Sequence, residues 1–116
     1  MISFKDFITE STDSKKLEQY AKSLGAELSL VDSKHIELAK IVVPKHLRGS
    51  GVGTKILMEI IKYADSSNKI ITLTPSADFG GNVSKLKKWY KSLGFVENKG
   101  KNKDYEISDL MYRLPQ

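Results

Sequence analysis

Apolar residues recur at helical spacing in three segments after residue 10 and predict three amphipathic helices. The first ends at Gly25, the second runs from Val52 to about residues 66–68, and the third follows Asn82 and ends at Gly94. Glycine suits the residue after a helix, and asparagine suits the residue before one. The apolar stripes are Leu17, Tyr20, Ala21 and Leu24; Val52, Ile56, Leu57, Ile60, Ile61 and Ala64; and Val83, Leu86, Tyr90 and Leu93. The polar residues opposite the second stripe, expected to face outward, are Lys55, Glu59, Lys62 and Asp65.

Between the helices lie runs with the composition and period of β-strands. Residues 26–31 and 35–43 flank a polar turn and predict an antiparallel hairpin. Residues 69–74 are rich in β-branched side chains and follow a helix, so we predict a strand parallel to the second hairpin strand. A short strand is expected after Phe95, before a polar loop. The last predicted strand has alternating apolar residues at Leu110, Tyr112 and Leu114.

The second hairpin strand changes phase along its length. Ile36 and Leu38 share one face, whereas Ile41 and Val43 are out of step with them by one residue. A β-bulge inserts one extra residue into a strand and shifts the later side chains to the other face. We therefore predict a bulge near residues 39–40.

A glycine-rich segment joins this strand to the second helix. Gly49, Gly51 and Gly53 let the backbone turn tightly and bring N–H groups close to a ligand, with Arg48 beside them. The first turn of the helix adds unpaired N–H groups and the positive end of its dipole. The segment therefore predicts a phosphate or pyrophosphate site. It has neither the Gly-Lys-Ser/Thr ending of a P-loop nor the G-x-G-x-x-G spacing of a dinucleotide-binding loop.

Length and composition narrow the class of protein. A chain of 116 residues is expected to form one domain. The absence of cysteine excludes disulfides and cysteine nucleophiles, and two histidines without an acidic cluster predict no metal site. No apolar run is long enough to cross a bilayer, so we expect a cytoplasmic protein. The net charge of +5 is spread over several segments, which suits a phosphorylated ligand better than nucleic acid.

Two motifs in this order resemble the GNAT superfamily of N-acetyltransferases. The first is Arg48-Gly49-Ser50-Gly51-Val52-Gly53, which is similar to the acyl-CoA-binding loop, and the second is Tyr90-Lys91-Ser92-Leu93-Gly94-Phe95, which resembles the closing corner of the domain. The resemblance covers about residues 35–114 and implies a single α/β domain with a mixed sheet flanked by helices. The family usually has a further strand and helix before the hairpin, so the N-terminal part is expected to be abridged.

The resemblance also implies an activity, the transfer of an acetyl group from acetyl-CoA to an amine in a ternary complex. Tyr90 would protonate the departing thiolate, and Glu37, eleven residues before Arg48, would be the base. The residues implied to bind acetyl-CoA are Ile41, Val42, Val43, Arg48, Gly49, Ser50, Gly51, Val52, Gly53, Thr54 and Asn82.

Alternatives stay open at several positions. Tyr90 could pack the core beside Trp89, and Glu37 could be a solvated strand carboxylate. His35 and His46 are weaker candidates for the base. The acceptor could be a small amine, a peptide N-terminus or a protein lysine. A non-catalytic acyl-CoA-binding protein, or one packaged in a virion, is the competing hypothesis.

Residues 1–10 are expected to be separate from the domain, which would occupy residues 11–116. Phe4, Phe7 and Ile8 have helical spacing and could dock on the core. The segment also resembles the capsid-targeting leader of internal head proteins from T4-type phages, in which a tripeptide like Ile8-Thr9-Glu10 is cleaved. This second resemblance implies association with a phage capsid.

Overall fold

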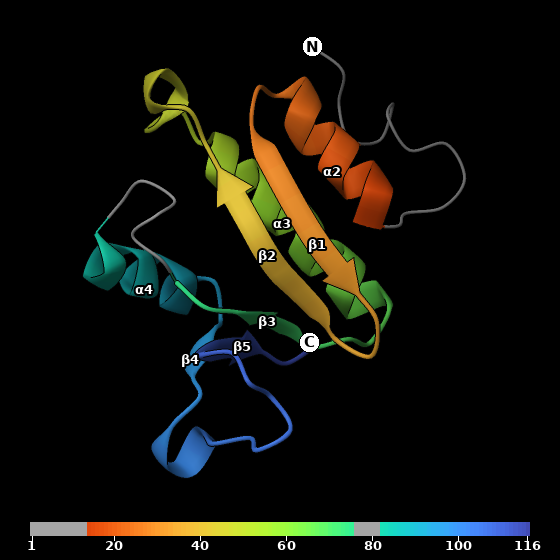
Figure 1. Ribbon diagram of the computed structural model, residues 1–116, viewed down its shortest axis with the longest axis vertical. Helices are drawn as coiled ribbons and strands as arrows, with labels where there is room; N and C mark the ends of the chain where they lie inside the picture. Colours follow the sequence, from red (N-terminus) through yellow and green to blue (C-terminus); the bar gives the residue numbers. More distant parts are fainter. Residues whose placement is uncertain (1–13, 76–81) are drawn as a thin grey trace.

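The computed structural model describes residues 14–75 and 82–116 (Figure 1), so the predicted leader at residues 1–10 lies outside the described residues. In the described part, five strands form one sheet in the order β1-β2-β3-β5-β4. The helices are α2 Ser14–Ser23, α3 Val52–Ser66 and α4 Val83–Ser92, with short 3₁₀ helices at Lys45–Leu47 and Gly100–Asn102. The strands are β1 Glu27–Asp32, β2 Ile36–Val42, β3 Ile71–Leu73, β4 Val96–Glu97 and β5 Met111–Arg113.

The sheet is mixed, as predicted. Strands β1 and β2 form the antiparallel hairpin, and β2 pairs in parallel with β3 after the crossover through α3. Strand β5 lies between β3 and β4 and is antiparallel to both. In Figure 1, α3 crosses behind β1 and β2, and α2 lies beside β1. This arrangement confirms a single α/β fold with helices packed on a mixed sheet.

The predicted bulge is confirmed in β2. Ser29 of β1 pairs with Lys40, and the next residue, Leu30, pairs with Leu38, so Ala39 is the extra residue. Ala39 and Lys40 are exposed, and the buried positions of β2 change phase across them. The bulge therefore keeps the apolar residues on both sides of it in the core.

Strand β2 extends beyond its parallel partner. The ladder between β2 and β3 runs from Ile36–Ile71 to Leu38–Leu73, and β2 continues to Val42. Within the described residues, the part of β2 that follows the bulge thus has a strand neighbour only on its β1 side. This part of β2 leads, through the 3₁₀ helix at Lys45–Leu47, into the glycine-rich segment.

The core follows the predicted helix stripes, with corrections at the polar face of α3 and in the last strand. Asp65 was expected to face outward, but its carboxylate binds the buried side chain of Arg113 at 2.8 Å. Leu110 and Leu114 are 54% and 56% exposed, because they lie just beyond the ends of β5. All three residues of β5 itself are buried, since this strand lies inside the sheet. Of the three alternating residues only Tyr112 is buried, so the alternation did not identify Met111 and Arg113.

A buried asparagine organises the loop between β4 and β5. The side chain of Asn98 donates to the carbonyls of Ile107 and Asp109 at 2.9 and 3.0 Å, and it accepts from the N–H of Asp104 at 2.7 Å. The hydroxyl of Thr74, just after β3, donates to the carboxylate of Asp109 at 2.8 Å. These bonds hold Asp109 beside the end of β3.

Candidate functional site

The glycine-rich segment turns the chain from β2 into α3 through two residues in the left-handed region. Gly49 has a φ of 84°, and Gly51, the N-cap of α3, has a φ of 87°. Side chains with a Cβ rarely adopt these angles, so the turn requires glycine at both positions. An added Cβ would meet no heavy atom within 4 Å at either residue, which means that their surroundings are open.

Backbone donors are available along this turn. The first hydrogen bond of α3 runs from the N–H of Lys55 to the carbonyl of Gly51 at 3.0 Å, and the N–H of Ser50 binds Leu47. Within residues 14–75 and 82–116, no acceptor accompanies the N–H groups of Gly49, Gly51, Val52, Gly53 and Thr54. Free N–H groups at the positive end of a helix form a favourable site for an anion.

These donors lie in the wall of a pocket of about 390 Å³. Its lining residues are Val43, Leu47, Arg48, Gly49, Gly51, Val52, Gly53, Thr54 and Trp89. The Nε atom of Arg48 donates to the carbonyl of Val43 at 3.1 Å, which ties this exposed side chain to the end of β2. The pocket thus combines backbone donors and one cation with apolar side chains, as a phosphorylated ligand with an apolar arm would need.

Four residues predicted to bind acetyl-CoA have side chains outside the pocket lining. Ile41 is buried in the core, and Val42 is partly exposed. The hydroxyl of Ser50 donates to the carbonyl of Leu47. Asn82 caps α4 as predicted, because its side chain accepts from the N–H groups of Ser84 and Lys85 at 2.8 and 3.3 Å.

Two lining residues, Leu47 and Trp89, were missed by the sequence analysis. Trp89 stands beside Gly53, where an added Cβ would lie 3.5 Å from the indole. The two residues belong to different helices and are far apart in the chain. The one sequence signal for Trp89 was its position directly before Tyr90.

Tyr90 lies at the inner face of α4. Its side chain is 4% exposed, and its ring centroid lies 5.0 Å from that of Trp89 and 5.5 Å from that of Phe95. Burial raises the pKa of the Tyr90 hydroxyl to about 12. The group is therefore protonated at neutral pH and could supply a proton.

Glu37 lies on the side of β2 opposite the buried residues Ile36 and Leu38, and it is partly exposed. A hydrogen bond with Asp109, the like charge of that carboxylate and partial burial raise the pKa of Glu37 above its ordinary value. A carboxylate with a raised pKa is a stronger base than a solvated one. The structure thus brings together Glu37 and Asp109, a residue that the sequence analysis did not consider.

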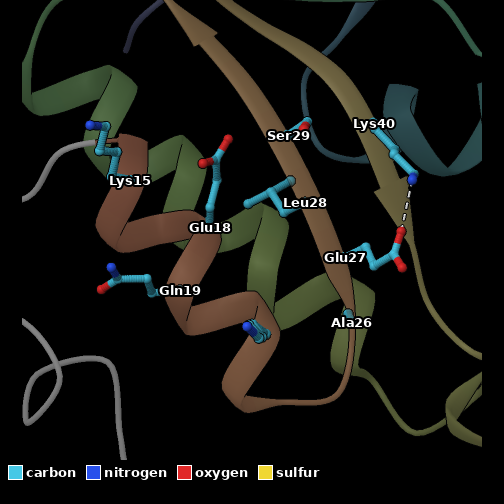
Figure 2. Close-up of a pocket in the computed structure, with 9 residues that line it drawn as sticks. Lys15, Glu18, Gln19, Ala26, Glu27, Leu28, Ser29 and Lys40 are labelled. Carbon is cyan, nitrogen blue, oxygen red and sulfur yellow. Dashed lines mark ion pairs between the residues drawn. The ribbon is translucent and has the colours of Figure 1, made fainter.

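A larger hollow of about 520 Å³ lies between α2 and β1, and Figure 2 shows its side chains. The carboxylate of Glu18 accepts the N–H of Leu30 at 2.8 Å, so it satisfies a donor on the outer edge of β1. Lys40 pairs with Glu27 at 2.8 Å, as the dashed line in Figure 2 marks. None of the predicted site residues lines this hollow, and its charges are of both signs. The smaller pocket at the glycine turn is therefore the better candidate for an anionic ligand.

The described residues have neither a candidate metal site nor a candidate membrane span. No group of three or more histidine, cysteine, aspartate or glutamate side chains there could hold a metal ion. Among the helices of the described part, none has the length and apolar character needed to span a membrane.

Known proteins resemble this chain in sequence and in fold. The sequence model of the acetyltransferase (GNAT) family matches residues 24–95, which include the glycine turn, Glu37 and Tyr90. No curated protein sequence matches the chain. The crystal structure of an acetyltransferase of the GNAT family from Staphylococcus aureus Mu50 superimposes with a TM-score of 0.56 at 21% sequence identity. The aligned part covers 78% of this chain and 60% of that structure, so this likeness concerns the fold alone.

Proposed function

This chain belongs to the acetyltransferase (GNAT) family, and we propose that it transfers an acetyl group from acetyl-CoA to the nitrogen of an amine. The observation that carries the proposal is a set of N–H groups that have no acceptor among the described residues and lie in the wall of a pocket, those of Gly49, Gly51, Val52, Gly53 and Thr54. A pyrophosphate is the part of acetyl-CoA that such donors would hold, with the charge of Arg48 beside it. The apolar wall of the same pocket would take the arm that carries the thioester.

Glu37 would act as the base. An alkylamine is protonated at neutral pH and must lose a proton before its nitrogen can attack the thioester carbonyl. Asp109 raises the pKa of Glu37, which makes Glu37 a better acceptor for that proton, taken directly or through one water. Glu37 would take one proton from the ammonium, and the freed nitrogen would then attack the carbonyl and form the C–N bond. The second proton that the nitrogen loses, when the adduct collapses, would pass through water to the general acid and restore it.

Tyr90 would act as the acid. Collapse of the tetrahedral adduct breaks the C–S bond, and the sulfur leaves more readily when it receives a proton. The hydroxyl of Tyr90 keeps its proton at neutral pH because burial raises its pKa to about 12. The sequence has no cysteine to form an acyl-enzyme, so we propose direct transfer in a ternary complex.

The proposal is tested by incubating the full chain with acetyl-CoA and a panel of small amines, peptides and lysine-containing proteins. Thiol release should depend on the amine, and mass spectrometry should find an acetyl group on its nitrogen. Calorimetry with CoA in parallel separates binding from turnover. Binding of CoA without amine-dependent thiol release from any acceptor in the panel would favour the non-catalytic alternative. Absence of CoA binding to the folded protein would contradict the assignment of the pocket.

A further inference from the structure

Trp89 is the one tryptophan of the sequence, and it is not part of either motif that resembles the GNAT family. Its indole is partly exposed and forms a wall of the glycine-turn pocket. The far edge of the ring faces the first turn of α3, since an added Cβ at Gly53 would lie 3.5 Å from Cη2 and 3.8 Å from Cζ2. The side chain thus spans the space between α4 and the start of α3.

The indole of Trp89 also packs against the ring of Tyr90, the proposed acid. Its ring centroid lies 5.0 Å from that of Tyr90, and the two rings are tilted by 42°. Val43, directly after β2, lies 3.6 Å from the same added Cβ, so Trp89 and Val43 both adjoin Gly53. A surface of two apolar side chains therefore runs from the N–H groups of the glycine turn toward Tyr90.

We propose that Trp89 binds the pantetheine arm of acyl-CoA and directs its thioester from the glycine turn toward Tyr90. This inference rests on the proposed function and adds a positioning residue to it. The arm is uncharged and partly apolar, and a flat indole offers it a large contact area with few rotatable bonds. The nucleotide end of the ligand carries phosphates and is held by the N–H groups instead. Trp89 should therefore discriminate ligands that have the arm from ligands that lack it.

The inference is tested first in the unmodified protein. Because the sequence has a single tryptophan, its fluorescence reports this position alone. CoA should change the intensity or the wavelength of emission with the same Kd that calorimetry measures. Adenosine 3′,5′-bisphosphate, which has no pantetheine arm, should bind more weakly and change the emission little.

Variants then separate a binding role from a structural one. Trp89→Leu should weaken CoA about tenfold through loss of apolar contact, and it should leave the affinity for adenosine 3′,5′-bisphosphate within twofold. Trp89→Phe keeps a flat ring and should recover most of the affinity for CoA. Tyr105→Leu is the matched control, because Tyr105 is an aromatic residue that is 90% exposed, and it should change neither affinity.

Two results would overturn the inference while leaving the proposed function in place. In the first, calorimetry shows that the unmodified protein binds CoA, but its indole emission does not change and Trp89→Leu has the same Kd for CoA. The other is an equal loss of affinity for both ligands in Trp89→Leu, which would show that Trp89 supports the turn and does not contact the arm. A protein that binds no CoA at all would refute the proposed function itself.

Discussion

The guanidinium of Arg113 in β5 binds the carboxylate of Asp65 in α3, with Nη1 2.8 Å from Oδ1. The Nε atom of the same arginine donates to the carbonyl of Leu93 at 3.0 Å. Gly94, with a φ of 99°, leaves room for this side chain, since an added Cβ would lie 3.1 Å from Nε. The glycine of the closing corner is thus explained by its positive φ and by the side chain of Arg113, whose partly buried ion pair and hydrogen bond join α3, the end of α4 and β5.

Breaking this pair should destabilise the fold. Arg113→Ala leaves the partly buried carboxylate of Asp65 without its partner, and we expect the free energy of unfolding to fall by about 3 kcal/mol. Urea unfolding at pH 7 measures this difference. The control is Lys34→Ala, because Lys34 and Glu106 form an ion pair whose side chains are 77% and 74% exposed, and its loss should change stability little. Similar effects of the two substitutions would contradict the interpretation.

The same pair should shape acid unfolding. Burial raises the pKa of Asp65, but hydrogen bonds from Arg113 and the N–H of Gln116 lower it more, so its folded pKa lies below the ordinary value. A group with a lowered folded pKa stabilises above its unfolded pKa, and that contribution is lost as the pH falls through the folded pKa. Asp65→Asn should therefore be less stable at pH 7 and should lose less stability on acidification. If the free energies of unfolding of the native protein and Asp65→Asn fall in parallel as the pH decreases, this account of Asp65 is wrong.

The pairing of Glu37 with Asp109 predicts a shift in the pH profile of the reaction. Asp109→Asn removes the like charge while its side-chain oxygen can still accept from Thr74, so the pKa of Glu37 should fall toward its ordinary value. If Glu37 is the base, the acid limb of kcat/KM should move to lower pH. In the native protein, protonated Glu37 stabilises the fold, and this contribution is lost as the pH rises through the raised pKa. In Asp109→Asn this pH-dependent contribution should be smaller. Glu106→Gln, on the same loop, is the control and should leave the pH profile unchanged. If the acid limb of kcat/KM does not move in Asp109→Asn, Glu37 is not the base.

Removing the hydroxyl of Tyr90 should separate catalysis from binding. Tyr90→Phe keeps the ring that packs against Trp89 and Phe95, so the affinity for CoA should stay within a few-fold. Loss of a general acid should lower kcat by about 10²–10⁴-fold. The decrease should be smaller for an acyl donor with a more acidic thiol, because a better leaving group needs less help from a proton. Undiminished turnover in Tyr90→Phe would mean that water or another group supplies the proton.

Two glycines of the same turn should respond to alanine in opposite ways. Gly53 lies in α3, where alanine is favoured over glycine and the added methyl group would make ordinary contacts with Trp89 and Val43, so Gly53→Ala should raise the unfolding free energy by about 0.5–1 kcal/mol. The methyl group also narrows the pocket and should weaken CoA binding. Gly51→Ala forces a Cβ into a φ of 87° and should lower stability by about 1–2 kcal/mol. Thermal unfolding and calorimetry measure both effects, and a common sign for the two stability changes would refute the account.

Much of the fold could be predicted from local patterns. Helices α2 and α4 end at Ser23 and Ser92, just before the left-handed glycines that were expected to stop them, and Asn82 caps α4. Such ends depend on a few neighbouring residues. The change of phase between Leu38 and Ile41 predicted the bulge, because the side-chain period of a strand is visible in its own residues. The glycine turn was recognised for the same reason. The sequence by itself therefore determined the elements, their order and the glycine turn that leads into α3.

Tertiary structure decided which side chains lie together at the candidate site. Glu37 and Asp109 are brought together by the sheet and by the loop that Asn98 organises, and Trp89 reaches Gly53 across two helices. Leu110 is apolar but exposed, because β5 begins one residue after it. Each of these relationships joins residues that are far apart in the chain or depends on neighbouring strands. Periodicity and capping report only nearby residues, so such contacts become visible when packing brings the elements together.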